Sequence, residues 1–299
     1  MSILVLGTVA LDTIKTPYGF KKKVLGGSAA HFSMSARLFT GVDLVAAVGE
    51  DFPPDYVDFL RSKKINISSL IIEKGRTFHW QGEYSGDLNT AFTKKTELGV
   101  LSSFKPRVTP AQRKSKYLFL ANVDPDIQKS LLELIHSPRL VAVDSMNYWI
   151  EHKRRALLKL LKRVDIYVAN DQEARVLSGE VNLIKAARAL RRLGPKMVLI
   201  KKGEHGVLFY GGNMKACLPA YPASRVIDPT GAGDTFAGGF MGYLAGKGRF
   251  SLAAIKKALA CGTIAASFNI EGFGLEKTAV LTLKDFKDRL REFKGYVIF

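Results

Sequence analysis

A chain of 299 residues in which 47% are hydrophobic can bury a core of domain size, which excludes a largely disordered protein. Its 45 Lys and Arg against 27 Asp and Glu give a net charge of +18, a balance that would suit a polyanionic partner. The basic residues are nevertheless spread along predicted helices without an aromatic-rich basic patch, so we interpret them as solvated helix faces and expect no nucleic acid as partner. A non-catalytic, basic nucleic-acid-binding protein remains a distant alternative.

Short β-branched segments alternate with helical patterns along nearly the whole chain. This alternation is typical of βαβ units and predicts one α/β domain over residues 1–299, built on a doubly covered, mostly parallel central sheet. The N-terminal segment MSILVLG has no basic residues before it and is interpreted as the first strand, and other apolar runs are too short for a bilayer, so a cytoplasmic location without membrane contact is expected. Strands are predicted at 3–6, 44–48, 116–120, 140–144, 166–168 and 197–201. Helices are predicted at 29–39, 54–63, 127–136, 151–161, 183–193, 235–245, 252–268 and 283–293.

One segment departs from this pattern. Residues 76–98 alternate apolar and polar side chains and are rich in Thr and aromatics, which predicts an antiparallel hairpin. Because an isolated hairpin is marginally stable, we expect it to join residues 13–24 in a small sheet. Such a sheet projecting from the main domain would suit a lid over a cleft, and an apolar outer face on it would allow a homodimer.

The segment DPTGAGDTFAGG at residues 228–239 carries the strongest chemical signal. Gly231, Ala232 and Gly233 lie where a helix begins, so free backbone amides and the helix dipole would favour an anion there. Asp234 follows within the first turn. A capping role is the simpler explanation for this Asp, but a carboxylate beside an anion-binding turn is also what a general base needs to activate a hydroxyl toward a phosphate.

This segment resembles the C-terminal signature of the ribokinase-like, or PfkB, carbohydrate and nucleoside kinases. The resemblance implies a ribokinase-like fold with a small β-sheet lid, ATP and Mg²⁺ as cofactors, Asp234 as catalytic base, and Gly231, Ala232 and Gly233 as the anion hole. Asp228 and Thr230 match positions that in many members help to hold a monovalent cation such as K⁺ beside the anion hole.

Two further motifs agree in order and spacing with the same family. Asn170 and Glu173, in NDQE after a predicted strand, resemble the motif that organises Mg²⁺ and phosphate through water, although the same pair is typical of a helix cap. Lys201, Gly203 and Gly206, in KKGEHG, resemble the turn that lies beside the nucleotide.

The N-terminal motifs point by resemblance to the acceptor. Asp12, Gly26 and Gly27 match positions that bind acceptor hydroxyls, although a turn Asp and a pair of helix-start glycines explain them equally well. His31 stands where many sugar kinases of the family have Asn, so ribose or fructose specificity does not carry over directly, and we include His31 among the candidate substrate-binding residues.

The sequence thus predicts an ATP-dependent kinase that phosphorylates a hydroxyl of a small sugar or nucleoside. Neither the Rossmann G-x-G-x-x-G turn after the first strand nor the P-loop motif occurs, which excludes those two classes of nucleotide-binding protein. A nucleoside is slightly preferred over a free ribose- or fructose-type sugar, because four aromatic side chains of the expected hairpin could stack on a base, although core packing also explains them. They are Phe78, Trp80, Tyr84 and Phe92.

Overall fold

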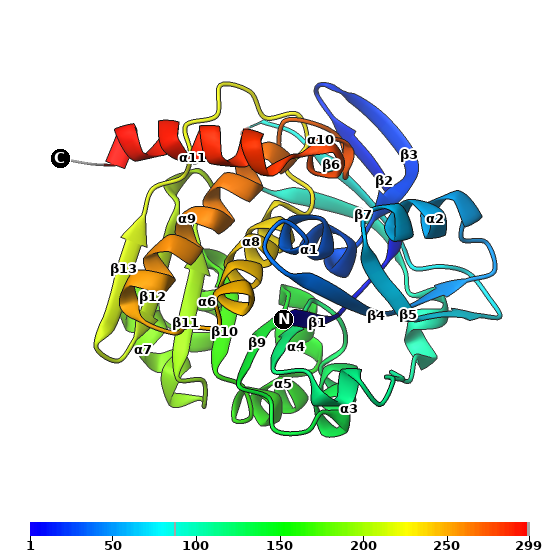
Figure 1. The fold of residues 1–299 in the computed structure, drawn as a ribbon, viewed down its shortest axis with the longest axis horizontal. Coiled ribbons are helices and arrows are strands. Elements are labelled where there is room, and N and C mark those ends of the chain that lie inside the picture. The colour runs from blue at the N-terminus through cyan, green and yellow to red at the C-terminus, as the bar shows by residue number, and fades with distance from the viewer. Residues whose placement is uncertain (87, 298–299) are drawn as a thin grey trace.

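The computed structural model describes residues 1–86 and 88–297, and its centre is a large sheet (Figure 1). The strand order is β13-β12-β11-β10-β9-β8-β1-β4-β5, with parallel pairing from β11 through to β5 and antiparallel pairing in the β11-β12-β13 edge. This is the mostly parallel sheet that the sequence predicts. The strands are β1 (Ser2–Leu6), β4 (Gly41–Gly49), β5 (Ile65–Glu73), β8 (Tyr117–Leu120), β9 (Leu140–Asp144), β10 (Ile166–Asn170), β11 (Met197–Lys201), β12 (Val207–Gly211) and β13 (Met214–Leu218).

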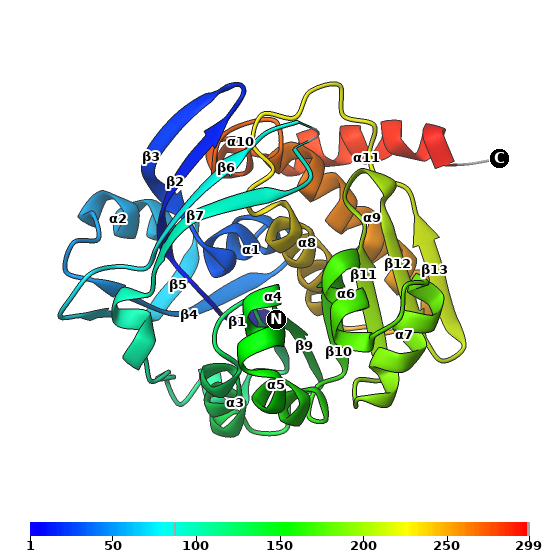
Figure 2. The same cartoon turned by 180° about the vertical axis from the view of Figure 1, so that it is seen from behind.

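Helices cover both faces of this sheet. Helices α1, α8 and α9 lie over the face seen in Figure 1, and α3, α5, α6 and α7 lie over the opposite face in Figure 2. The helices are α1 (Ser28–Ala36), α2 (Pro54–Ser62), α3 (Pro125–Leu134), α4 (Asn147–His152), α5 (Arg154–Leu161), α6 (Asp171–Ser178), α7 (Leu183–Arg192), α8 (Ala232–Lys247), α9 (Leu252–Asn269), α10 (Glu276–Val280) and α11 (Leu283–Val297). Short 3₁₀ turns span Gly99–Ser103, Gln112–Lys114 and Gly203–His205.

The core is divided into two layers by the sheet itself. Along β1, Ile3 and Val5 belong to the apolar cluster beneath α1, α8 and α9, whereas Leu4 and Leu6 belong to the cluster beneath α3, α5, α6 and α7. Alternate side chains of a strand point to opposite faces, so a strand covered on both sides is apolar throughout. This explains why β1 is a continuous apolar segment in the sequence.

A second, four-stranded sheet lies at the edge where the parallel strands end (Figures 1 and 2). Its order is β3-β2-β6-β7, in which two antiparallel hairpins are joined by parallel pairing of β2 with β6. The expected pairing of residues 13–24 with 76–98 is therefore present, and Asp87, within the second segment, lies outside the described residues. The strands are β2 (Ala10–Thr16), β3 (Gly19–Gly26), β6 (His79–Tyr84) and β7 (Ala91–Glu97).

Several elements differ from the sequence prediction. No sequence pattern predicted β5, the β12-β13 hairpin, α6 or α10. The Gly212-Asn213 turn was a local signal for the hairpin, and the Asn170/Glu173 capping pair was one for α6. The helix expected at 151–161 is two helices, because Lys153 leaves helical geometry at φ −125° and ψ 27°. Helix α8 begins at Ala232, three residues earlier than expected, so Gly233 lies inside its first turn.

Across residues 1–86 and 88–297, we find no helix that is both long and apolar enough to span a bilayer.

Candidate active site

The candidate residues gather at the carboxyl edge of the parallel strands. Asp144, Asn170 and Lys201 are the last residues of β9, β10 and β11, which are neighbours in the sheet. Asp12 lies on β2, which begins four residues after β1 ends. In open α/β sheets the carboxyl edge is where ligands bind, so strand order brings together side chains that are far apart in sequence.

The start of α8 carries the glycine turn that the sequence predicts as an anion site. Gly231, the N-cap, is left-handed at φ 71°. The Ala232 amide already donates to the Pro229 carbonyl oxygen at 3.1 Å. Within the described chain, the amides of Gly231 and Gly233 donate to no backbone or side-chain acceptor, whereas the Asp234 amide donates to its own carboxylate. The amides open to a ligand are therefore those of Gly231 and Gly233, and the contribution of Ala232 is its position in the turn.

Asp234 lies beside these amides in the first turn of α8, and its side chain is half-buried. No side chain of residues 1–86 or 88–297 donates a hydrogen bond to its carboxylate. Burial raises the pKa of Asp234 to about 7, the negative charge of Asp144 adds to the rise, and the Lys201 ammonium opposes it. Apart from the bond that the residue's own amide donates, the carboxylate is unpaired, and a carboxylate with a pKa near neutrality can take a proton from an alcohol.

Asp12 is the second carboxylate of the site and is 4% exposed. Its Oδ2 accepts a hydrogen bond from the Gly27 amide at 3.2 Å. Burial raises the pKa of Asp12 to about 7, and the charges of Asp228 and Asp234 act in the same direction. A Cβ on Gly26 would lie 2.0 Å from Oδ2 of Asp12, so only glycine allows this strand to approach the carboxylate so closely. Asp12, Gly26 and Gly27 are thus brought together as expected.

Asp228 stabilises the turn that precedes α8 through hydrogen bonds. It is completely buried, and its two carboxylate oxygens accept from the amides of Thr230 and Gly274, each at 2.9 Å. The Thr230 hydroxyl donates to the Tyr84 hydroxyl of β6 at 3.3 Å. Both residues therefore tie the turn to neighbouring segments, a role that the sequence did not indicate.

Asn170 and Glu173 form a reciprocal capping box at the start of α6. The Asn170 amide donates to Glu173 Oε2 and the Glu173 amide donates to Asn170 Oδ1, both at 2.7 Å. Burial raises the pKa of Glu173, and the nearby Asp144 charge adds to the rise. The second Glu173 oxygen accepts from no other group of the described chain, so it offers an acceptor to a metal-bound water.

Lys201 forms an ion pair that the sequence did not predict. Its Nζ donates to Asp144 Oδ2 at 2.8 Å, and the two side chains are 17% and 5% exposed. A Cβ built on Gly233 would lie 3.0 Å from the same Nζ, so the ammonium lies against the first turn of α8. Burial acts to lower the pKa of Lys201, but the carboxylates of Asp144, Glu173 and Asp234 outweigh it and raise the pKa above its usual value.

His31 lies behind the anion site rather than on its surface. The side chain is 1% exposed, and its Nδ1–H donates to Asn269 Oδ1 at 2.9 Å. Burial lowers the pKa of His31 to about 4, so the ring is neutral. A Cβ on Gly231 would lie within 2.3 Å of the ring, which shows that the imidazole packs directly beneath the turn. His31 is therefore not placed to contact an acceptor, contrary to the substrate-binding role expected from sequence.

A cavity of about 460 Å³ adjoins the anion site, a size typical of small-molecule sites. Its lining includes the turn that the sequence predicts to lie beside a nucleotide and the start of α8, namely Lys201, Gly203, Gly206, Ala232 and Gly233. Its remaining walls come from residues before and within α8 and α9 and from the β6–β7 connection, where Asn89 Nδ2 donates to Glu204 Oε1 at 3.1 Å. The small sheet thus reaches this cavity.

The four aromatic residues of the hairpin have different environments. Tyr84 is 8% exposed and packs with Ile14 and Phe273 under the small sheet, where the partly buried Trp80 joins them. Phe78 packs against the main core, and Phe92 is 53% exposed. Only Trp80 and Tyr84 therefore lie on the face of the small sheet that is turned toward the site.

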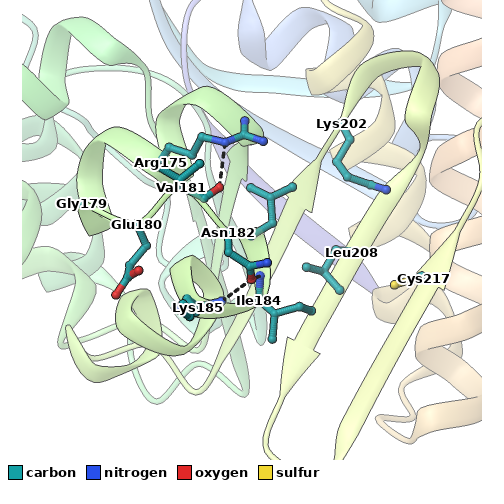
Figure 3. Close-up of a pocket in the computed structure, with 11 residues that line it drawn as sticks. Arg175, Gly179, Glu180, Val181, Asn182, Ile184, Lys185, Lys202, Leu208 and Cys217 are labelled. Atoms are coloured by element: carbon teal, nitrogen blue, oxygen red, sulfur yellow. Dashed lines mark hydrogen bonds between the residues drawn. The ribbon is translucent and has the colours of Figure 1, made fainter.

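A second cavity, of about 800 Å³, lies between the α6–α7 connection and strands β11 to β13 (Figure 3). Lys202 reaches it from the end of β11, while Leu208 and Cys217 reach it from the β12-β13 hairpin. Arg175 is already engaged, because its Nε donates to the Val181 carbonyl oxygen at 3.1 Å and its guanidinium pairs with Asp171. This cavity contains none of the candidate catalytic carboxylates.

A half-buried carboxylate, a glycine turn with unpaired amides and a cavity of small-molecule size at one sheet edge are the features that a phosphotransferase acting on an alcohol needs. The chain belongs to the pfkB family of carbohydrate kinases, whose family model matches residues 2–278. It is thus an ATP-dependent kinase with a hydroxyl acceptor.

Individual relatives agree with this assignment. The chain is 35% identical over 254 residues to a cytidine kinase of Thermococcus kodakarensis, a match that covers 83% of this chain and 90% of the relative. It is 25% identical over 258 residues to a nucleoside kinase of Methanocaldococcus jannaschii, covering 85% and 82% of the two chains. The solved nucleoside kinase of Burkholderia thailandensis in complex with inosine superposes with a TM-score of 0.78 at 19% identity and covers 98% of this chain and 99% of that one, which shows the shared fold.

Proposed function

We propose that this kinase transfers the γ-phosphoryl group of ATP to a ribose hydroxyl of a nucleoside, with cytidine as the first candidate. The observation that carries the proposal is the position of Asp234 between two groups. Its charge raises the pKa of Asp12 and also that of Lys201. The base is thus near both the candidate acceptor carboxylate and a residue that lines the cavity beside α8. The similarity to a cytidine kinase supports a nucleoside as the acceptor.

The proposed reaction uses these groups in a defined order. Asp12 and the Gly27 amide orient the acceptor's hydroxyls, and Asp234 removes the proton of the attacking hydroxyl as its oxygen bonds to the γ-phosphorus. The bond from that phosphorus to the bridging oxygen breaks, and ADP leaves. The amides of Gly231 and Gly233 stabilise the charge on the transferring group.

Mg²⁺ fits this site through water and phosphate rather than through a protein cage. Within the described part of the chain, no three His, Cys, Asp or Glu residues are grouped so as to hold a metal ion. The unpaired oxygen of Glu173 could accept from a metal-bound water, consistent with the preference of Mg²⁺ for phosphate and water ligands. When bound, the ion would neutralise charge on the nucleotide phosphates.

A free-sugar kinase is the second candidate. The positions of two aromatic residues favour it. Phe78 packs against the core and Phe92 is exposed, so fewer rings are available to stack on a nucleoside base than the sequence suggested. Ribokinases also share the fold: that of Arabidopsis thaliana, solved with ribose and ATP, superposes with a TM-score of 0.78 at 19% identity and covers 97% of this chain and 98% of that one.

The test is a panel of nucleosides and free sugars in an assay that couples ADP release to a colour change. We expect turnover with cytidine or another nucleoside, and loss of turnover in Asp234→Asn with ADP binding retained. Exclusive use of a free pentose or hexose would overturn the nucleoside assignment. An Asp234→Asn enzyme with wild-type activity would overturn the role of the base.

Other predictions from the sequence remain open. They are a K⁺ site at Asp228 and Thr230, a lid formed by residues 13–24 and 76–98 on a single domain over 1–299, a homodimer and a cytoplasmic location.

A further inference from the structure

The ion pair between Lys201 and Asp144 lies next to the anion site, although it joins strands that are not neighbours. Asp144 ends β9, Lys201 ends β11, and β10 lies between them in the sheet. The lysine side chain crosses the end of β10 and brings Nζ to within 3.0 Å of the position that a Cβ on Gly233 would occupy. The glycine leaves room for the ammonium beside an unpaired amide.

We propose that Lys201 supplies the cationic part of the anion site and that Asp144 is its positioning residue. On this proposal, the Lys201 ammonium contacts oxygens of the terminal phosphate of ATP beside the Gly233 amide, and Asp144 holds the ammonium there before the nucleotide binds. The inference rests on the proposed function, since it assigns the charge that the transferring group meets.

The balance of charge supports a role beyond structure. Three carboxylates, those of Asp144, Glu173 and Asp234, act electrostatically on the one Lys201 ammonium. A terminal phosphate would bring further negative charge to this group, and a fixed cation would offset the repulsion between that phosphate and the base. The ammonium carries three N–H donors and Asp144 accepts one of them, which leaves donors for phosphate oxygens.

A structural role alone accounts for the pair less well. Taking two charges out of water costs several kcal/mol per ion, and replacing such a pair with apolar residues is often neutral or stabilising. Lys201 also lines the nucleotide cavity, whereas the adjacent Lys202 lines the separate cavity of Figure 3. Lys202 is therefore a matched control with the same chemistry and a neighbouring position.

The experiment measures binding of MgATP and MgADP by calorimetry without acceptor, together with kcat on the acceptor found for the wild type. For Lys201→Met we expect the preference for ATP over ADP to fall about tenfold. We expect kcat to fall about 100-fold or more. Lys202→Met should behave as the wild type. Unchanged ATP preference and kcat in Lys201→Met would overturn the inference.

Because Lys201→Met leaves Asp144 buried without its partner, the single variant could lose stability for that reason alone. The double variant Lys201→Met with Asp144→Asn removes both charges and should recover thermal stability. If Lys201 acts on phosphate, the double variant stays defective in ATP preference and kcat. Recovery of both to within about threefold of wild type, roughly 0.7 kcal/mol, would show a purely structural pair and overturn the inference.

The binding measurements also separate this inference from the proposed acceptor. A wild-type enzyme that ignores nucleosides but loses ATP preference on Lys201→Met would contradict the acceptor and support the role of Lys201. If the wild type phosphorylates nucleosides and Lys201→Met keeps both the ATP preference and kcat, the acceptor is supported and the role of Lys201 is contradicted.

Discussion

The Nδ1 nitrogen of His31 lies 2.9 Å from Oδ1 of Asn269, across a sequence separation of 238 residues. The same Asn269 oxygen accepts from the Thr235 hydroxyl at 2.9 Å, and the Asn269 Nδ2 donates to the Thr230 carbonyl oxygen at 2.8 Å. One buried amide therefore joins α1 and α9 to both sides of the anion turn. His31 acts on the site through this amide and by packing beneath Gly231.

Asn269→Ala should loosen the anion turn. The change removes three hydrogen bonds and leaves buried polar groups unpaired, so we expect the free energy of unfolding to fall by about 2 to 4 kcal/mol and kcat to fall with it. Hydrogen exchange at residues 230–235 should accelerate. Asn182→Ala, which removes an exposed cap of α7, provides the control: it should lower stability slightly without changing exchange in that turn. Unaltered exchange in Asn269→Ala would contradict the role given to this amide.

Gly231→Ala should be far more damaging than its backbone angle alone requires. Gly231 and Gly179 have nearly the same left-handed φ, 71° and 73°. A Cβ on Gly231 would lie 2.3 Å from the His31 ring, whereas one on Gly179 would meet nothing within 4 Å. Gly179→Ala therefore measures the backbone strain, about 1 kcal/mol. Chemical denaturation should show a clearly larger loss of unfolding free energy for Gly231→Ala than for Gly179→Ala, and Gly231→Ala should also lose turnover. Equal losses of unfolding free energy in the two variants would be evidence against the packing of His31 beneath Gly231.

Protonation of Asp12 should stabilise the fold. The pKa of Asp12 rises from 3.8 to about 7 on folding, so the folded protein binds the proton more tightly than the unfolded chain. The protonated Asp12 carboxyl therefore adds a few kcal/mol to the free energy of unfolding. This contribution is complete below about pH 4 and is lost as the pH rises through 7. Asp12→Asn, which cannot ionise, should match the wild type near pH 4 and exceed it in stability at pH 8.

Urea denaturation of both proteins across this pH range measures the difference. A constant difference in unfolding free energy from pH 4 to pH 8 would show that the pKa of Asp12 is not raised. The variant should also bind its acceptor more weakly, which a higher KM for the acceptor with an unchanged KM for ATP would report.

The chemistry at the start of α8 could be predicted because its parts are adjacent in sequence. Gly231, Gly233 and Asp234 belong to one turn, where local rules for glycine, helix ends and carboxylates apply. The pair Asn170 and Glu173 was recognisable for the same reason. The hydrogen bonds show its structural role, which is to cap the start of α6. The alternation of strands and helices likewise determined the parallel sheet, because each element carries its own hydrophobic period.

Only the tertiary structure decided which distant residues meet. Asp144 and Lys201 are 57 residues apart and pair because β9, β10 and β11 lie side by side and end at the same edge. His31 looks from sequence like a substrate residue, but the packing of α1 against α8 and α9 buries it beneath Gly231. Such contacts depend on strand order and helix packing, which no local pattern encodes. The sequence by itself thus determined the class of chemistry, and the fold decided which side chains surround it.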